Sequence, residues 1–258
     1  MPWIVSAWTA AHGQMPFVTD DAGVTRKGGI HIESFDEFDW LQAALTPHLR
    51  QNTINGRLNV GLGNGLEVDL DAPLLTIYNT GVVTPRRSFG IGDTEFGLKW
   101  NFRGAPDDTA PGTSAFSGVF YIEIPTGNVA TGLGSGLVDT WLYVVAQRTL
   151  GHQTTVHGNL GYLVTGNPAT GAIGLTASGH VATMSASITR QFTPALSLGV
   201  ELAGAVADVR AQNHAQLQAM FGGTYALSDN FALAMSLVGG HFAASPQYGI
   251  QIGFSMDR

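Results

Sequence analysis

Apolar and polar residues alternate along most of the chain, in runs of about ten residues. Leu66, Val68 and Leu70 share one face of such a run, whereas Glu67 and Asp69 share the other. A period of two indicates an extended strand, because successive side chains of a strand point to opposite faces. About ten residues is also the length of a tilted strand that crosses a membrane. The pattern therefore predicts a sheet of long, two-faced strands.

About twelve such runs follow one another, and the segments that connect them alternate in length. Tight connections such as "GLGN" and "ALSDN" alternate with longer ones such as "TGNVATGLGSG" and "GHFAASPQ", although "RGAPDDTAPGTS" is long where a short turn is expected. Bacterial outer-membrane barrels alternate short periplasmic turns and longer extracellular loops in this way, and an even number of strands places both termini in the periplasm. The predicted strands are residues 28–40, 50–62, 65–75, 91–102, 115–125, 137–148, 153–165, 178–191, 195–206, 212–224, 230–239 and 247–257.

The two faces of these strands differ in a way that separates a membrane barrel from a soluble sandwich, which would also alternate. One face carries aliphatic residues, with Trp and Tyr towards the strand ends, as a lipid-facing surface does. The other carries Gly, Ser and Ala beside carboxylates and amides, as a narrow polar lumen would. The sequence therefore predicts an all-β fold, a closed antiparallel transmembrane β-barrel in the bacterial outer membrane.

Composition supports a membrane barrel and excludes several other classes. Charged residues make up 12% of the chain, about half the usual share of a soluble protein. No window holds the ~20 uninterrupted apolar residues of a transmembrane helix. The absence of Cys excludes zinc-thiolate sites, disulfides and thiol catalysis. The net charge of −7, with Lys and Arg scattered, argues against a nucleic-acid partner.

The N-terminus divides into two segments before the first predicted strand. In "MPWIVSAWTAAHGQ", an apolar stretch precedes the small-x-small pattern Ala11-His12-Gly13, as in the latter part of a secretory signal. A short buried N-terminal strand is the alternative. We expect residues 1–13 to be a truncated signal peptide, 14–27 to be a periplasmic segment and 28–258 to form the barrel. Because Pro16 to Lys27 is polar and directly precedes the first strand, it is a candidate plug for the lumen.

A glycine-rich stretch, "IPTGNVATGLGSG", raises the question of a nucleotide site. A dinucleotide loop needs G-x-G-x-x-G, and a phosphate loop needs a Lys after its glycines. Here Gly132, Gly134 and Gly136 run G-x-G-x-G without a Lys, and the segment that follows is rich in strand-forming residues. The stretch is better interpreted as a loop between two barrel strands.

Ser178 and His180 are the best candidates for catalysis, because both have the parity of the lipid face. A lipid-facing Ser/His pair would suit an outer-membrane phospholipase, but no Asp or Asn is clearly placed to orient the base. The alternative is a pair of polar residues at the rim. We therefore predict no catalytic residue. The eight histidines do not fall at ligand spacing, so no metal site and no cofactor is predicted either.

Ionisable residues cluster on the polar face and are the candidate pore-lining set. They form either neutralising ion pairs that stiffen a narrow barrel or an acidic constriction that favours cations over anions. The set is Arg57, Glu67, Asp69, Asp71, Asp93, Glu95, Lys99, Glu123, Asp139, His157 and Glu201.

Several short motifs, in order and spacing, resemble the outer-membrane β-barrel "transporter" family named after the meta-pathway of phenol degradation. They are "PFVTDDAGVTRKG", "GIGDTEFGLKWNF", "YIEIPTGN" followed by "GLGSGLVDTW", and "GNLGYLVTGN". That family typically shows G-x-G-D at a strand start, then P-T-G and G-x-G-S-G, which correspond to Gly90–Asp93, Pro125–Gly127 and Gly132–Gly136. The resemblance covers the chain after about residue 16 and implies a channel for small, aromatic or otherwise hydrophobic solutes. It implies no catalytic residue.

Three functions fit these observations: a passive or facilitated channel, a lipid-modifying barrel enzyme, and a closed structural or adhesin-like barrel. The channel is the preferred hypothesis, with outer-membrane lipid, a small-molecule solute and the barrel assembly machinery as expected partners. Outer-membrane strands often end in a terminal aromatic, whereas this chain ends "GFSMDR", with Phe254 as its last aromatic residue.

Overall fold

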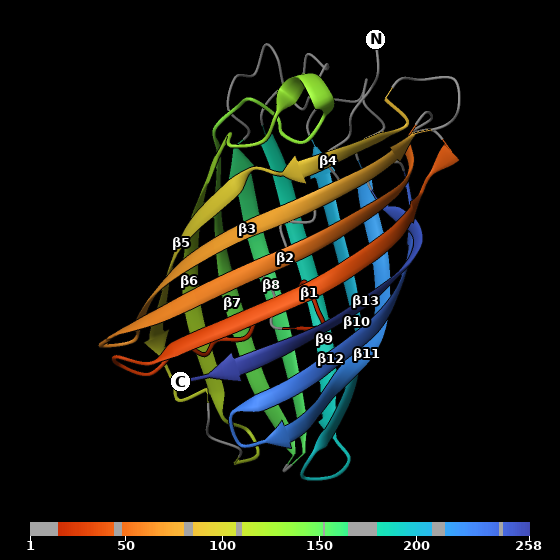
Figure 1. Ribbon diagram of the computed structural model, residues 1–258. Coiled ribbons are helices and arrows are strands. Elements are labelled where there is room, and N and C mark those ends of the chain that lie inside the picture. The colour runs from red at the N-terminus through yellow and green to blue at the C-terminus, as the bar shows by residue number, and fades with distance from the viewer. Residues whose placement is uncertain are drawn as a thin grey trace.

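The computed structural model describes residues 15–43, 48–79, 85–106, 110–151, 153–164, 180–207, 215–242 and 245–258. Antiparallel strands form one sheet, which closes into a barrel because β1 bonds to both β2 and β13 and β2 bonds to β3 (Figure 1). No helix in these ranges has the length and apolar character to cross a bilayer. The strands are β1 Ile30–Leu41, β2 His48–Gly63, β3 Leu66–Asn79, β4 Arg87–Ile91, β5 Thr94–Arg103, β6 Ser114–Ile124, β7 Asp139–Gly151, β8 Thr154–Val164, β9 His180–Gln191, β10 Leu196–Ala207, β11 Ala215–Ser228, β12 Phe231–His241 and β13 Pro246–Asp257.

The barrel has twelve strand positions, because two of its thirteen strands share one position. β4 bonds to the C-terminal part of β3, from Leu74 to Tyr78, and β5 bonds to its N-terminal part, from Leu66 to Asp71. The two are therefore halves of one strand that breaks at Gly92 and Asp93. The predicted closed antiparallel barrel is confirmed, and the predicted fourth strand, 91–102, is extended by β4 beyond the break.

The turns match the predicted barrel, whereas several strands run beyond their predicted ends. Asn64 and Gly65 form the turn between β2 and β3 with φ angles of 55° and 76°, and positive φ at both residues is what a two-residue type I′ hairpin requires. The amide of Ile30 donates to the carbonyl of Arg258 at 2.9 Å, so β1 starts and β13 ends on the same side. The connection between β12 and β13 is shorter than predicted, because both strands continue until only residues 242–245 separate them.

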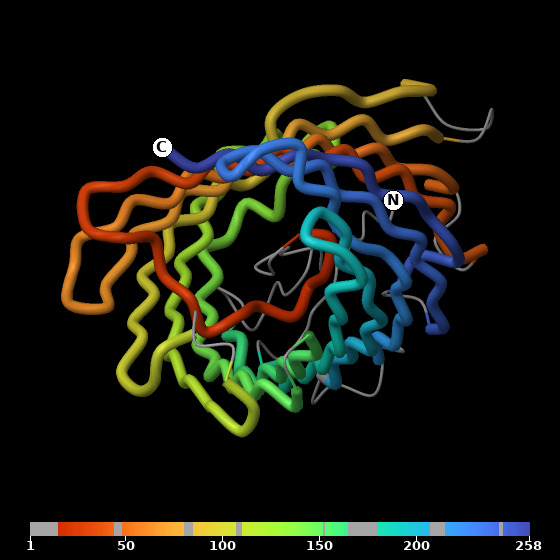
Figure 2. Tube along the Cα trace, turned by 90° about the horizontal axis from the view of Figure 1, so that it is seen from below, coloured from red at the N-terminus to blue at the C-terminus, as the bar shows by residue number. Residues whose placement is uncertain are grey.

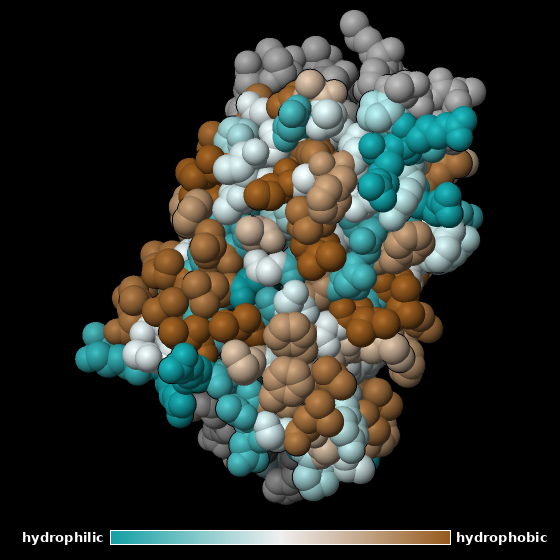
Figure 3. Space-filling view, in the orientation of Figure 1, coloured by the Kyte–Doolittle hydropathy of each residue, from teal (hydrophilic) through white to brown (hydrophobic). Residues whose placement is uncertain are grey.

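Side chains alternate between the lumen and an apolar outer surface, as the period-two pattern predicts. Leu142 and Leu160 are 60% and 64% exposed on the outside, whereas Tyr143 and His157 on the same two strands are buried inside. Hydrophobic residues cover much of the outer surface in Figure 3. Such a surface is suited to lipid and not to water.

Residues 15–29, which we call the strap, run inside the barrel before β1 begins (Figure 2). At one end Phe17 packs against Met220 of β11 and Val238 of β12. At the other end the amide of Gly28 donates to the carbonyl of Gly61 on β2 at 2.8 Å. The strap thus follows the inner wall from β12 round to β2.

Two sequence-based expectations lie outside the described residues. One is the signal peptide at residues 1–13, and the other is the candidate nucleophile Ser178. Neither is tested by the structure.

Candidate functional site

Glu201 on β10 binds the backbone of the strap. Its two carboxylate oxygens accept hydrogen bonds from the amides of Val18 at 3.1 Å and Thr19 at 2.5 Å. Glu201 is 2% exposed and Thr19 is 3% exposed, so water does not compete for these bonds. A carboxylate at this position therefore holds the strap through backbone groups, whatever the strap side chains are.

Lys99 on β5 makes the strongest charged contact with the strap. Its Nζ lies 2.8 Å from Oδ1 of Asp20 and 3.5 Å from Oδ1 of Asp21. The hydroxyl of Tyr143 on β7 donates to the other carboxylate oxygen of Asp20 at 3.2 Å. The buried ammonium and the two strap carboxylates therefore form one group that ties the strap to β5 and β7.

The two strap carboxylates respond to this environment in opposite directions. Burial raises the pKa of Asp20 to about 6, although attraction to Lys99 lowers it. Burial also acts to raise the pKa of Asp21, but the charges of Lys99 and His157 and the amide of Gly23 bring it below its usual value. Both residues belong to the strap and not to a membrane-spanning strand. Asp21 is therefore the carboxylate that the site holds charged over the wider pH range.

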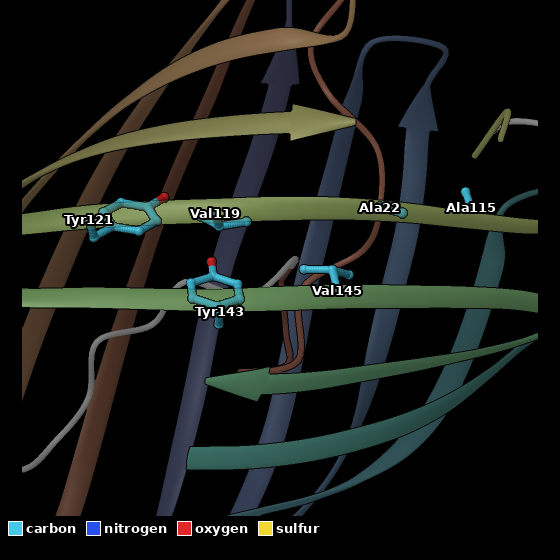
Figure 4. Close-up of a cluster of buried hydrophobic side chains, with 6 residues drawn as sticks. All are labelled: Ala22, Ala115, Val119, Tyr121, Tyr143 and Val145. Atoms are coloured by element: carbon cyan, nitrogen blue, oxygen red, sulfur yellow. The ribbon is translucent and has the colours of Figure 1, made fainter. Parts of the chain in front are cut away.

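The next part of the strap is bound through its backbone and by packing. The carbonyl of Ala22 accepts from the side chains of Ser117 at 2.7 Å and Asn101 at 2.8 Å, and its amide donates to Gln147 at 3.1 Å. Figure 4 shows Ala22 beside β6, in a cluster with Ala115, Val119, Tyr121, Tyr143 and Val145. Because Ala22 is fully buried, a larger side chain at this position would have to displace its neighbours.

Two further polar groups brace the lumen on the side of β1–β3. Glu67 accepts from the amide of Thr25 at 2.5 Å. Arg57 lies between two carboxylates, 3.1 Å from Glu33 and 2.9 Å from Asp71. Ion pairs across three neighbouring strands neutralise the buried guanidinium and stiffen this wall.

A second group of carboxylates lies at the opposite, outer end of β5, β6 and β7. Glu95 is in register with Glu123, and Glu123 is in register with Asp139. Neighbouring strands lie about 4.8 Å apart, so these three acids lie side by side on the inner wall. The local charge at this end of the barrel is negative.

Asp93 fastens the loop that follows β6. Its carboxylate accepts from the amides of Gly127 at 2.9 Å and Ser135 at 2.6 Å. A Cβ on Gly134 would lie 2.4 Å from Oδ1 of Asp93, and one on Gly127 would lie 2.3 Å from the carbonyl oxygen of Leu133. The G-x-G-D, P-T-G and G-x-G-S-G motifs therefore meet in space, which explains why the loop needs its glycines.

The remaining predicted lumen residues, Asp69 and His157, are buried on the inner face of the barrel. Asp69 is 1% exposed and accepts from the hydroxyl of Tyr121 at 2.9 Å. His157 is buried, with Nδ1 3.4 Å from the hydroxyl of Ser187. The structure therefore brings the predicted set together in three groups: around the strap, around Arg57 and at the outer end of β5–β7.

Sequence reasoning missed the strap acids and Glu33 as members of these groups. The signal for Asp20 and Asp21 was available, because "TDD" lies in the segment interpreted as a candidate plug and Lys99 has lumen parity. Of the catalytic candidates, His180 lies at the outer end of β9 and is exposed, with its ring nitrogen 2.8 Å from the hydroxyl of Tyr162. Within the described residues, no group of three His, Asp or Glu side chains is arranged to hold a metal ion.

A cavity of about 50 Å³ lies beside the strap, bordered by Val18 of the strap and by Trp141 and Thr183 of the wall. This volume is the space open to the centres of water molecules, and one water needs roughly 10–15 Å³ of such space, so the cavity has room for a few waters.

The barrel and its strap match a known family of proteins. A family model described as "Putative MetA-pathway of phenol degradation" matches residues 19–256, which include most of the strap and nearly the whole barrel. The chain belongs to this family. The resemblance inferred from the glycine motifs is thereby confirmed. No curated protein matches the sequence.

Solved structures with the same fold are channels and porins of the outer membrane. The COG4313 outer membrane channel from Pseudomonas putida F1 is 12% identical, with a TM-score of 0.69 over 92% of this chain and 98% of that one. The NanC porin is 9% identical, with a TM-score of 0.57 over 88% and 98% of the two chains. The KdgM porin is 9% identical, with a TM-score of 0.55 over the same shares. At these identities the likeness shows the fold, and the protein is a β-barrel of the bacterial outer membrane.

Proposed function

We propose that this family member is a channel for small solutes, and that the strap closes its lumen in the conformation described above. The observation that carries the proposal is the path of the strap, which is bound by Glu201 on β10 and, across the lumen, by Lys99 and Glu67 on the neighbouring strands β5 and β3. A structural barrel would gain the same rigidity by filling its lumen with wall side chains. A segment held by polar contacts can exchange those contacts for water and detach.

The contacts of the strap favour a plug that can move. Its charged contacts are with Lys99, and its backbone contacts are with carboxylate, amide and hydroxyl side chains. Water can satisfy the hydrogen-bonding groups of the strap and of the wall equally well, so each bond contributes a net of about 0.5–3 kcal/mol to the binding of the strap. Since the strap runs through the lumen from β12 round to β2, we infer that solutes pass when the strap is displaced.

The two hypotheses for the lumen charges each apply to a different part of the barrel. Arg57 and Lys99 form the neutralising ion pairs. The row of Glu95, Glu123 and Asp139 provides an acidic entrance that favours cations and neutral solutes over anions. We include small aromatic compounds among the candidate solutes, because the family description concerns phenol degradation and because Trp141 packs with Leu163 and Val181 inside the lumen.

Conductance in planar bilayers tests the channel. We expect the full chain to show small or rare conductance steps, and a variant that begins at Gly23, and so lacks the first half of the strap, to show larger and longer-lived steps. Heat-dependent migration on a detergent gel confirms that both barrels are folded. A sealed bilayer for both folded proteins would refute the channel, and equal conductance of the two would refute closure by the strap.

A further inference from the structure

Five outward-facing side chains form a row across neighbouring strands near the outer rim, and we call them the rim row. Each is in register with the next, so that β13, β1, β2, β3 and β4 contribute one residue each. Two arginines thus alternate with tyrosines and a tryptophan at one level of the barrel. In register order the rim row is Tyr248, Trp40, Arg50, Tyr78 and Arg87.

The aromatic rings of the rim row hold its shape. The rings of Trp40 and Tyr248 stack with their centroids 4.8 Å apart. The guanidinium carbon of Arg50 lies 5.7 Å from the centroid of Tyr78, which is within the range of a cation–π contact. Arg50 and Arg87 flank Tyr78 on strands two positions apart, so their backbones are about 10 Å apart. Both arginines are exposed, and both can reach a group placed over Tyr78.

Positive charge is concentrated at this part of the outer rim. Arg86 is exposed next to Arg87, and Figure 3 shows a hydrophilic patch over the upper right ends of β1–β4. Within the described ranges, the other Lys and Arg residues of the strands lie in the lumen or towards the opposite rim. On β1, the carboxylate of Asp39 is 1% exposed and points inward. The carboxylate of Asp36 lies on the outer face two turns of the pleat below Trp40, where it accepts from the side-chain amide of Asn52 on β2.

The surroundings of the rim row suit a lipid and not a soluble ion. Trp and Tyr concentrate at the level of lipid headgroups, because their rings are apolar and their polar ends reach water. Below the row the outer face continues with Phe38, Ile54 and Leu74, which suit acyl chains, and the polar pair Asn52 and Asp36 between them is closed by its own hydrogen bond. Arginine binds phosphate through two parallel hydrogen bonds, and an aromatic neighbour adds nothing to the binding of free phosphate.

We propose that the rim row binds the phosphate group of an anionic lipid in the outer leaflet, with Arg50 and Arg87 on either side of the phosphate and the acyl chains along the apolar face below. This surface is separate from the lumen. The site is therefore independent of the channel function proposed above.

Native mass spectrometry of the full chain in detergent tests the site, with a phosphorylated saccharolipid of the lipid A type as the probe. We expect the double variant Arg50→Gln/Arg87→Gln to bind this lipid at least tenfold more weakly, because two charge-assisted hydrogen-bonding groups are lost. Arg148→Gln/Arg190→Gln is the matched control, since both residues are exposed on the outer face near the opposite rim and Arg190 also lies over an aromatic ring. Heat-dependent migration shows that both variants form closed barrels.

Three outcomes would overturn the proposal. Equal weakening by the two double variants would mean that any outer arginine serves. Undiminished binding of the dephosphorylated lipid would mean that the phosphate is not recognised. Displacement of the lipid by millimolar inorganic phosphate would mean that the arginines form a site for a free anion instead.

Discussion

Replacing Lys99 by Met should release the strap, because this substitution removes the cation that lies 2.8 Å from Asp20 and 3.5 Å from Asp21. Breaking a buried ion pair by removing one partner costs about 3–5 kcal/mol. Since 1.4 kcal/mol is a factor of ten, the detached fraction of the strap should rise roughly 10²- to 4 × 10³-fold at pH 8. Lys99→Arg keeps the charge and should restore most of the binding.

Protonation of Asp20 limits this effect at low pH, so the effect of the substitution should depend on pH. A neutral Asp20 needs no cation, and the free energy of protonating a free aspartate with a pKa of 3.8 is about 1.6 kcal/mol at pH 5, at 1.36 kcal/mol per pH unit. In the Asp21→Asn background, where only Asp20 loses its cation, the effect of Lys99→Met should therefore fall to roughly tenfold or a little more at pH 5. At pH 8 the free energy of protonating a free aspartate is about 6 kcal/mol, so protonation does not limit the effect there.

The native chain contains no cysteine, so one engineered thiol can report on the strap. Thr19 is 3% exposed, and Thr19→Cys is close to isosteric. The rate of modification by a water-soluble maleimide, corrected for the thiolate fraction at each pH, measures how often the strap detaches. Equal rates with and without the Lys99→Met substitution at pH 8, in barrels that both shift on heating, would refute the argument that the ion pair holds the strap.

Three further predictions follow from the lumen and its loop. In the Thr19→Cys background, burial makes the pKa of Asp20 higher in the bound strap (about 6) than in the free strap (3.8), so binding weakens by up to about 3 kcal/mol as the pH rises from 4 through 6. Corrected labelling should rise over this window, and adding Asp20→Asn should abolish the rise. The triple variant Glu95→Gln/Glu123→Gln/Asp139→Asn should move the reversal potential in a salt gradient towards anions, whereas Arg148→Gln, on the outer face, should leave it unchanged. Asp93→Asn should weaken attachment of the loop by about 1.5–3 kcal/mol and speed its cleavage by an added protease, and an unchanged cleavage rate would contradict the role of this carboxylate.

The strands and their two faces were predictable because they depend on local chemistry. A residue such as Glu201 has lumen parity simply because its neighbours in the chain are apolar, and a two-residue period survives even where strand ends are misjudged. The strand ends themselves were less predictable, since β2 and β3 continue beyond the length that a bilayer demands. A strand continues past the membrane wherever its neighbouring strand also continues, because the backbone hydrogen bonds between the two strands continue with them.

The contacts of the candidate site were mostly not predictable. Lys99 and Asp20 are 79 positions apart and meet because the strap crosses the lumen, and no sequence period records such a contact. The function of Asp93 was hidden for a related reason. It was interpreted as a pore-lining acid, but its oxygens accept bonds from a loop more than thirty residues away. The glycine motifs revealed the family without revealing that they meet.

The path of the strap also constrains the order of assembly. Its binding groups are spread over most of the circumference, from Gly61 on β2 to Val238 on β12, and Met15 packs against Phe35 of β1 and Ala234 of β12. These groups come together only once the first and last strands have paired. The segment that is synthesised before the barrel must therefore settle after it, so a bound strap indicates a completed barrel.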